Sequence, residues 1–484
     1  MLKKNDKVCV EITDYTDEGL GVGKTVTGEG SFTLFVKDTA VGDRAEVVVT
    51  KVNKTFGYGR PVSVIEPSPD RCDPECPVAS RCGGCSLRHI SYEAQLKWKE
   101  KRVKDCMDRI GGLTPGKDFG FFSIKGMDVP GRYRNKAQYP VGIKDGRIVT
   151  GFYAGRTHSV IASDDCLIEP EGFGRILKEI RAFAEENKIS VYDEKTGRGI
   201  LRHILLREGM GGKEIMVCLV VNALPGSGKL SVFEGLADKL TRTPEIRTFL
   251  LSHNTSRTNV VLGREETCLF GEGCIRDRVG DRLYDISARS FYQVNPAQTK
   301  VLYDTAAEYA GLTGSETVWD LYCGTGTIGL YLADKAGSVY GVEVVQSAVD
   351  DARQNAKTNG VSNASFFCGK AEDIVIKADC SGICPEKALP GMAAAGHTGG
   401  SITLPHPDVI VVDPPRKGCD TRLLDTISGS GAKRIVYVSC NPATFARDAS
   451  VLTDSGYRLE KLQPVDMFPH TTGVECVGVF IRND

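Results

Sequence analysis

One cysteine stands where a strand gives way to a helix, and a thiol in that position can act as a nucleophile. Cys440 lies in the stretch SCNPATFARD, after the apolar run KRIVYV and before a predicted helix. Unpaired amides and the helix dipole at a helix start lower the pKa of a thiol and favour the reactive thiolate. The alternative is a small buried residue at a strand end. The neighbours of Cys440 decide between these two interpretations.

A glycine-containing turn and a later glutamate indicate a nucleotide site. The sequence VWDLYCGTGTIGL predicts a strand, a turn at Gly324 and Gly326, and a helix. Glu343 ends the next predicted strand, about where nucleotide-binding α/β folds place a carboxylate that accepts hydrogen bonds from ribose hydroxyls. The turn lacks the GxGxxG pattern, which favours an adenosyl ligand such as S-adenosylmethionine over a dinucleotide. The alternative is an ordinary tight turn with a surface glutamate.

A third motif, DPPR, begins at Asp413 and ends at Arg416, just after the fourth predicted strand of the same region. Its two prolines stiffen the backbone at the edge where open parallel sheets bind ligands. Methyltransferases that act on amino groups resemble this region but place a base-stacking aromatic residue where Arg416 stands. The arginine disfavours nitrogen methylation and leaves a carbon acceptor. Such an acceptor needs a covalent strategy, because an aromatic ring carbon is a poor nucleophile.

A cluster of cysteines near the first quarter of the chain points to metal. The stretch CPVASRCGGC holds Cys76, Cys82 and Cys85, and DDCLIEP adds Cys166. Four thiolates of this kind bind zinc or an iron–sulfur cluster, and the spacing does not choose between them. Cys72 is a fifth cysteine, which we treat as a spectator. The alternative is a set of unligated core cysteines.

Three segments are predicted to position these residues. Residues 1–66 contain short β-rich runs broken by glycine turns, which indicates a small β-barrel of the TRAM or OB type. Residues 72–285 mix strands with a charged helix and predict an α+β domain that carries the cysteine cluster. In residues 286–484, strands ending in loops alternate with helices, which predicts a doubly wound, Rossmann-like α/β domain. Residues 376–406 interrupt this pattern as an inserted loop that contains Cys380, Cys384 and His397.

Composition excludes several classes of protein. The chain has 484 residues and a formal net charge of −1, so an RNA partner must be held by local patches such as GRYRNKAQYP and GRGILRHILLREG. No signal peptide or membrane-spanning stretch is evident, and an odd total of 17 cysteines argues against a disulfide framework. We therefore expect a cytoplasmic monomer without a DNA or membrane partner.

Taken together, the motifs resemble a known family. FYQVN, DLYCGTGTIGL, VEVV, DPPRKG, SCNPATFARD and MFPHTTGVE occur in the order and spacing of the bacterial RNA uracil-5 methyltransferases. The resemblance is strongest to the 23S ribosomal RNA branch, and it extends to the barrel, which is similar to a TRAM domain, and to the cysteine cluster. It implies that Cys76, Cys82, Cys85 and Cys166 hold a [4Fe–4S] cluster. It also implies an S-adenosylmethionine site that includes Gln293, Tyr322, Gly324, Glu343 and Asp413.

The resemblance further implies a covalent mechanism. Cys440 is expected to attack carbon 6 of uracil, after which carbon 5 takes the methyl group. Glu475 is expected to act as the base that removes the proton from carbon 5, so that elimination frees the cysteine. One position departs from the family pattern, because Gly473 stands where a histidine usually precedes the Val-Glu pair. His470 is a candidate to replace that histidine, and the alternative is an ordinary surface histidine.

The expected substrate is a uridine of 23S ribosomal RNA. We base this on the barrel and the cysteine cluster, both of which we expect to be missing from relatives that act on tRNA. Two alternatives are a tRNA uridine-5 methyltransferase and a non-catalytic iron–sulfur protein that binds RNA. The presence of both Cys440 and Glu475 argues against the second alternative.

Overall fold

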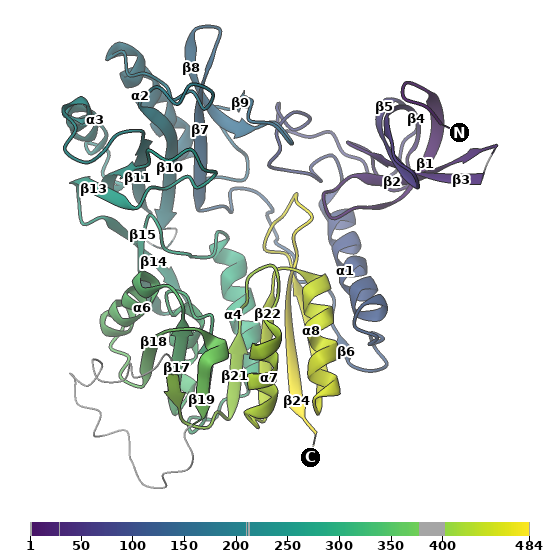
Figure 1. Ribbon diagram of the computed structural model, residues 1–484, viewed down its shortest axis with the longest axis vertical. Helices are drawn as coiled ribbons and strands as arrows, with labels where there is room; N and C mark the ends of the chain where they lie inside the picture. Colours follow the sequence, from purple (N-terminus) through teal and green to yellow (C-terminus); the bar gives the residue numbers. More distant parts are fainter. Residues whose placement is uncertain (1, 29, 210, 212, 377–401, 484) are drawn as a thin grey trace.

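The computed structural model describes residues 2–28, 30–209, 211, 213–376 and 402–483. Figure 1 shows a small barrel, a mixed sheet with two helices, and a larger sheet covered by helices on both faces. The centre of the proposed inserted loop, with Cys380, Cys384 and His397, lies outside the described residues. The two strands that flank it, β19 (Ile374–Ile376) and β20 (Ile402–Leu404), pair in parallel.

The N-terminal part is a closed five-stranded barrel with the strand order β1-β2-β3-β5-β4, as the sequence predicts. Its strands are β1 (Lys7–Tyr15), β2 (Gly21–Thr27), β3 (Gly30–Val36), β4 (Arg44–Val52) and β5 (Phe56–Glu66). Alternate residues point inward, so that Val10, Ile12, Leu34, Val36 and Val47 form its core.

The central part is a seven-stranded sheet in the order β13-β12-β11-β10-β7-β8-β9. These strands are β7 (Lys136–Lys144), β8 (Arg147–Tyr153), β9 (Val160–Ala162), β10 (Leu201–Gly209), β11 (Glu214–Val221), β12 (Ile246–His253) and β13 (Glu265–Phe270). The helices α2 (Gly172–Glu186) and α3 (Val232–Leu240) bury their apolar sides against the sheet. A hairpin of β14 (Cys274–Val279) and β15 (Arg282–Ser287) leads from this part to the next.

The C-terminal sheet has eight strands in the order β18-β17-β16-β21-β22-β24-β23-β6. The first five in that order are mutually parallel, which confirms the predicted α/β class. Only β24 among the next two strands is reversed, because it pairs antiparallel with both β22 and β23. The strands are β6 (Gly120–Phe121), β16 (Thr317–Leu321), β17 (Ser338–Glu343), β18 (Ala364–Cys368), β21 (Val409–Val412), β22 (Arg434–Ser439), β23 (Tyr457–Val465) and β24 (Glu475–Arg482).

Helices cover both faces of this sheet. One face carries α4 (Pro296–Ala310), α5 (Thr327–Leu332) and α6 (Gln346–Thr358), and the other carries α1 (Tyr92–Arg109), α7 (Thr421–Gly429) and α8 (Pro442–Asp454). Both α1 and β6 come from the sequence between residues 72 and 285, yet α1 packs on α8 and β6 pairs with β23. In Figure 1, α1 lies between the barrel and α8.

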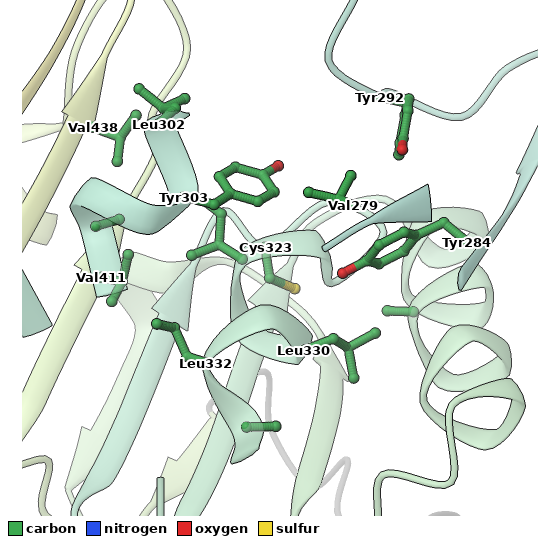
Figure 2. Close-up of a cluster of buried hydrophobic side chains, with 14 of the residues drawn as sticks. Val279, Tyr284, Tyr292, Leu302, Tyr303, Cys323, Leu330, Leu332, Val411 and Val438 are labelled. Atoms are coloured by element: carbon green, nitrogen blue, oxygen red, sulfur yellow. The ribbon is translucent and has the colours of Figure 1, made fainter. Parts of the chain in front are cut away.

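A buried cluster behind the glycine turn fixes the turn relative to the sheet (Figure 2). Tyr303 of α4 hydrogen bonds Thr327, the first residue of α5, at 2.8 Å between their hydroxyl oxygens. The hydroxyl of Tyr284 donates to the carbonyl of the same threonine at 3.1 Å. Val411 and Val438 are fully buried in the same cluster. Val411 stands two residues before Asp413, and Val438 stands two residues before Cys440.

Candidate active site

Cys440 occupies the junction that the sequence predicts, directly after β22 and before α8. Asn441 caps the helix, because its side-chain oxygen accepts the N–H of Ala443 at 3.1 Å. Pro442 is the first helical residue, a position where the missing N–H costs little. The Asn441 side chain also donates to the carbonyl of Arg416 at 3.1 Å. The cysteine segment and the DPPR segment are therefore tied to each other.

Glu475 lies across from Cys440 in the sheet. It is the first residue of β24, which runs antiparallel to β22, and the register pairs Ser439 with Cys476. One step further along this ladder brings Cys440 opposite Glu475. Asp413 follows β21, the neighbour of β22 on the other side. A thiol and two carboxyl groups therefore meet at the carboxyl edge of the parallel strands.

The proton on the thiol is held more tightly than the sequence predicts. Burial raises the pKa of Cys440 to about 11, and the carboxyl groups of Glu475 and Asp413 add to the rise. The Arg416 guanidinium and a backbone N–H lower the pKa by less. The expectation that the helix start lowers the pKa of this thiol is therefore wrong. Desolvation and neighbouring negative charge outweigh the helix dipole.

The pKa values of the two carboxyl groups are raised as well. Burial raises the pKa of Glu475 well above its usual value, with a further contribution from Asp413 and an opposing one from Arg416. Burial raises the pKa of Asp413 to about 7. Both carboxyl groups therefore bind a proton more readily than an exposed carboxyl group does. A cation or a polar substrate that enters the site will change these pKa values.

The glycine turn contacts Glu343, the glutamate that the sequence analysis selected. Tyr322, Gly324 and Gly326 all have positive φ angles, of 62°, 54° and 75°. A side chain at Gly326 would put its Cβ 2.8 Å from the Phe366 ring. The Glu343 carboxylate accepts the N–H of Gly324 at 3.2 Å and that of Val345 at 2.9 Å. The turn and the carboxylate therefore form one unit.

Asp320 belongs to this site, although the sequence reading did not select it. It is buried at the penultimate position of β16, and one of its oxygens accepts the N–H of Gly329 at 2.8 Å. Its other oxygen has no hydrogen-bond partner within the described part of the chain. Burial raises the pKa of Asp320 to about 7, and Asp413 and Glu343 contribute. The sequence did contain a signal for Asp320, because an acidic residue is unusual inside an apolar strand such as TVWDL.

Gln293 is anchored where the central and C-terminal parts meet. It is buried, and its backbone carbonyl accepts the side-chain N–H of Asn135 at 3.2 Å. The backbone N–H of Asn135 in turn donates to Val294 at 2.9 Å. Asn295 caps α4 and also donates to the carbonyl of Met467 at 3.0 Å. This segment is therefore held by both neighbouring parts of the protein.

Comparison with known sequences and structures places this chain in a family. The model of the family described as tRNA (Uracil-5-)-methyltransferase matches residues 262–484, and that of the TRAM domain matches residues 2–62. An uncharacterized RNA methyltransferase of Bacillus cereus is 45% identical over 481 residues, which is 99% of this chain and 98% of the relative. The chain belongs to the RNA uracil-5-methyltransferase family.

Two further proteins show how far the likeness extends. A relative from Clostridium tetani, also called an uncharacterized RNA methyltransferase, is 42% identical over 98% of this chain and 96% of its own length. A crystal structure of the tRNA (uracil-54, C5)-methyltransferase of Pyrococcus abyssi with S-adenosyl-L-homocysteine is 27% identical. It covers 97% of this chain and 99% of its own, with a TM-score of 0.71. The likeness to this family thus includes the barrel.

The glycine that departs from the expected family pattern fits its surroundings closely. A Cβ at Gly473 would lie 2.9 Å from the Phe468 ring, so a larger residue requires that ring to move. His470 is half-buried, with Nε2 2.8 Å from the carbonyl oxygen of Pro130 and Nδ1 3.3 Å from the amide nitrogen of Gln95. Burial lowers the pKa of His470 to about 4. His470 is therefore a neutral structural residue, not a surface one.

The four clustered cysteines line one cavity of about 470 Å³, which also touches Arg88, Arg134 and Lys136. Burial raises the pKa of Cys82, Cys85 and Cys166. Among the described residues, no three His, Cys, Asp or Glu side chains converge on a point that could hold a single metal ion. Cys72 is exposed, and its thiol contacts the carbonyl of Arg88.

Within the described residues, none of the helices is both long and apolar enough to cross a bilayer.

Proposed function

We propose that this protein methylates carbon 5 of a uridine in RNA through a covalent bond to Cys440, with S-adenosylmethionine as the methyl donor. The observation that carries the proposal is the row of groups at one edge of the sheet. Adjacent strands β17, β16, β21, β22 and β24 present, in that order, Glu343, the glycine turn, Asp413, Cys440 and Glu475. A donor site and a nucleophile therefore lie side by side.

The row of carboxylates suits a cationic adenosyl ligand. Gln293, Tyr322, Gly324, Glu343 and Asp413 are the residues we propose to hold it. Asp320 holds α5, the helix that follows the turn, by accepting the N–H of Gly329. The ligand supplies an electrophilic methyl group. The pKa values of Asp413 and Asp320 are each raised to about 7, so a positive charge beside these groups favours their ionised forms.

Cys440 and Glu475 divide the covalent chemistry between them. Cys440 passes its proton to solvent and forms a bond from sulfur to carbon 6, and the electrons of the ring double bond make carbon 5 nucleophilic. S-adenosylhomocysteine would be the leaving group when carbon 5 takes the methyl group. Once carbon 5 carries the methyl group, the Glu475 carboxylate removes its proton. The double bond reforms, and the thiolate leaves carbon 6. Arg416 favours the ionised forms of Cys440 and Glu475, which is a reason for an arginine at that position.

We propose 23S ribosomal RNA as the substrate, on the resemblance of the motifs and the cysteine stretch to that branch. A tRNA is the second candidate. The Pyrococcus abyssi structure, named as a tRNA enzyme, matches 97% of this chain. The expectation that relatives acting on tRNA lack the barrel is therefore wrong, and the barrel does not separate the two substrates.

A competition between the two RNAs tests the substrate. Purified enzyme with labelled S-adenosylmethionine is offered unmodified 23S fragments and unmodified tRNA at equal concentration, and we expect the label to enter the ribosomal fragments at carbon 5 of uridine. Preferential labelling of tRNA would leave the chemistry in place and reassign the substrate. An absence of label in both RNAs, with bulk unmodified RNA as a further substrate, would favour the non-catalytic alternative.

We also propose that Cys76, Cys82, Cys85 and Cys166 hold a [4Fe–4S] cluster. Two features support it: the four cysteines are among the residues that line one cavity, and cationic side chains line the same cavity and can offset the negative charge of four thiolates. Each cysteine of such a cluster binds a different iron, so the thiols need not converge on one point. The cluster would link the cysteine loop to the segment around Cys166 and would take no part in methyl transfer.

The metal content of the protein tests this assignment. Protein purified without oxygen should be brown and contain about four iron and four sulfide per chain. Cys166→Ser should lose most of the iron, and Cys72→Ser, a matched change outside the cavity, should retain it. A colourless sample with stoichiometric zinc would contradict the assignment.

A further inference from the structure

The turn of residues 466–474 directly precedes Glu475, so its position sets the position of the proposed base. Its first half is held by α1 through a buried ion pair, in which Lys99 Nζ lies 2.6 Å from Asp466 Oδ1 and both side chains are fully buried. Lys99 also donates to the carbonyl of Phe468 at 3.0 Å. Gln95 of the same helix accepts the N–H of His470 at 2.9 Å. Helix α1 thus fixes the turn as far as His470.

The second half of the turn is held by a three-way contact that includes the barrel. Arg102 of α1 donates through Nη1 to the carbonyl of Thr472 at 2.8 Å. Its Nη2 lies 2.8 Å from the Asp17 carboxylate, in the barrel turn between β1 and β2. The Thr472 hydroxyl completes the triangle by donating to the carbonyl of Asp17 at 2.6 Å. Thr472 stands three residues before Glu475.

The barrel turn is itself fixed, so it can serve as a reference point. Trp98 Nε1 donates to the Asp14 carboxylate at 2.9 Å, and Lys101 Nζ donates to the other oxygen at 2.9 Å. Gly19 has a φ of 79°, and a Cβ there would lie 2.8 Å from that of Ser86. The turn is therefore clamped between α1 and the segment that follows the cysteine stretch.

The contacts among Arg102, Asp17 and Thr472 indicate that Arg102 fixes positions and contributes little to stability. The Asp17 side chain is 81% exposed and that of Arg102 is 15% exposed, so their ion pair adds little stability by itself. The planar guanidinium instead spans two acceptors on two different elements, which a lysine cannot do in the same way. Such a fork fixes the distance between the barrel turn and Thr472.

We propose that Arg102 is a positioning residue that uses the docked barrel to hold Glu475 in place for proton removal. This inference rests on the proposed role of Glu475 as the base. The barrel then has a second task besides any contact with RNA, because it forms part of the support of the active site. Loss of this support slows elimination more than methyl transfer, since Cys440 is held separately by β22 and α8.

The test measures which step slows. Arg102→Met keeps the aliphatic stem and removes the fork, and we expect kcat to fall about tenfold or more, as for other small misplacements of reacting groups. The KM for RNA should stay within about twofold, because the substituted groups are not placed against substrate. A methylated covalent protein–RNA adduct should accumulate on a denaturing gel. Arg102→Lys should restore part of the rate.

Two further variants make the test specific. Lys101→Met removes a barrel contact from the same helix without touching residues 466–474. We expect it to behave as wild type, because Trp98 still binds the Asp14 carboxylate. Thr472→Val removes the hydroxyl contact to the barrel, and we expect a fall of about fivefold in kcat with the same adduct, the size of effect that one hydrogen bond produces. Thr472→Val decides the question if Arg102→Met does not fold.

The outcomes separate this inference from the proposed function. Normal kcat without adduct in Arg102→Met and Thr472→Val, together with a trapped adduct in Glu475→Gln, would overturn the inference and leave the base assignment intact. An equal loss in Lys101→Met, without adduct, would show general damage to barrel docking and would also overturn it. If Glu475→Gln turns over without adduct, the base assignment fails and the inference fails with it.

Discussion

Cys440→Ala is expected to abolish methyl transfer while S-adenosylmethionine still binds. The thiol acts on the pyrimidine ring, and without it carbon 5 stays a poor nucleophile, so the rate should fall on the order of 10⁴-fold or below detection. The proposed cofactor residues lie at the end of β17, directly after β16 and β21, and in the segment before α4, and none of these segments contains the thiol. Cofactor affinity should change by less than about threefold, which is the scale of a lost neutral contact.

Two measurements on the same protein preparations check this result. Label transfer from S-adenosylmethionine to RNA reports activity, and titration calorimetry with S-adenosyl-L-homocysteine reports the cofactor site. Cys268→Ala is a matched control, because Cys268 is an exposed thiol on β13 of the central sheet. Full activity in Cys440→Ala would contradict the covalent mechanism.

Glu475→Gln is expected to trap the RNA on the protein. The substitution keeps the shape of the side chain and removes the base, so attack by Cys440 and methyl transfer proceed while elimination stops. One methyl group per enzyme should transfer, and multiple turnovers should fall on the order of 10²-fold to 10⁴-fold, the usual contribution of a general base. The product should be a slowed band on a denaturing gel that carries the label of the methyl group.

The double variant Cys440→Ala with Glu475→Gln supplies the control, since it should show no slowed band. Repeated turnover by Glu475→Gln without a band would assign the proton removal to another group. Asp413 is the first candidate in that case, because it is the carboxyl group that acts electrostatically on both Glu475 and Cys440.

Local sequence signals were enough for the elements that carry the site. The glycine turn, the strand before Cys440 and the proline at the start of α8 are set by residues within a few positions of one another, so their patterns could be read directly. The alternation of strands and helices likewise predicted the α/β sheet. These are the features for which periodicity and turn chemistry act over short distances.

Features that depend on distant residues could not be predicted in this way. The raised pKa of Cys440 comes from burial and from Glu475 and Asp413, and their approach is set by strand order. The docking of α1 on α8 and the pairing of β6 with β23 join residues far apart in the sequence. Arg102 had no local pattern, because its partners lie in the barrel and in the turn before β24.

The packing of α1 on α8 has a consequence for synthesis on the ribosome. Val103 and Met107 of α1 are buried in the same apolar cluster as Phe445 and Ala446 of α8. Phe445 is made 342 residues after Val103, which corresponds to about 20–70 s at usual elongation rates. During that interval the apolar side of α1 has no native partner from α8. The apolar side of α1 therefore lacks its α8 partner for most of the synthesis of the chain. A chaperone that binds exposed apolar surface could bind α1 during this time.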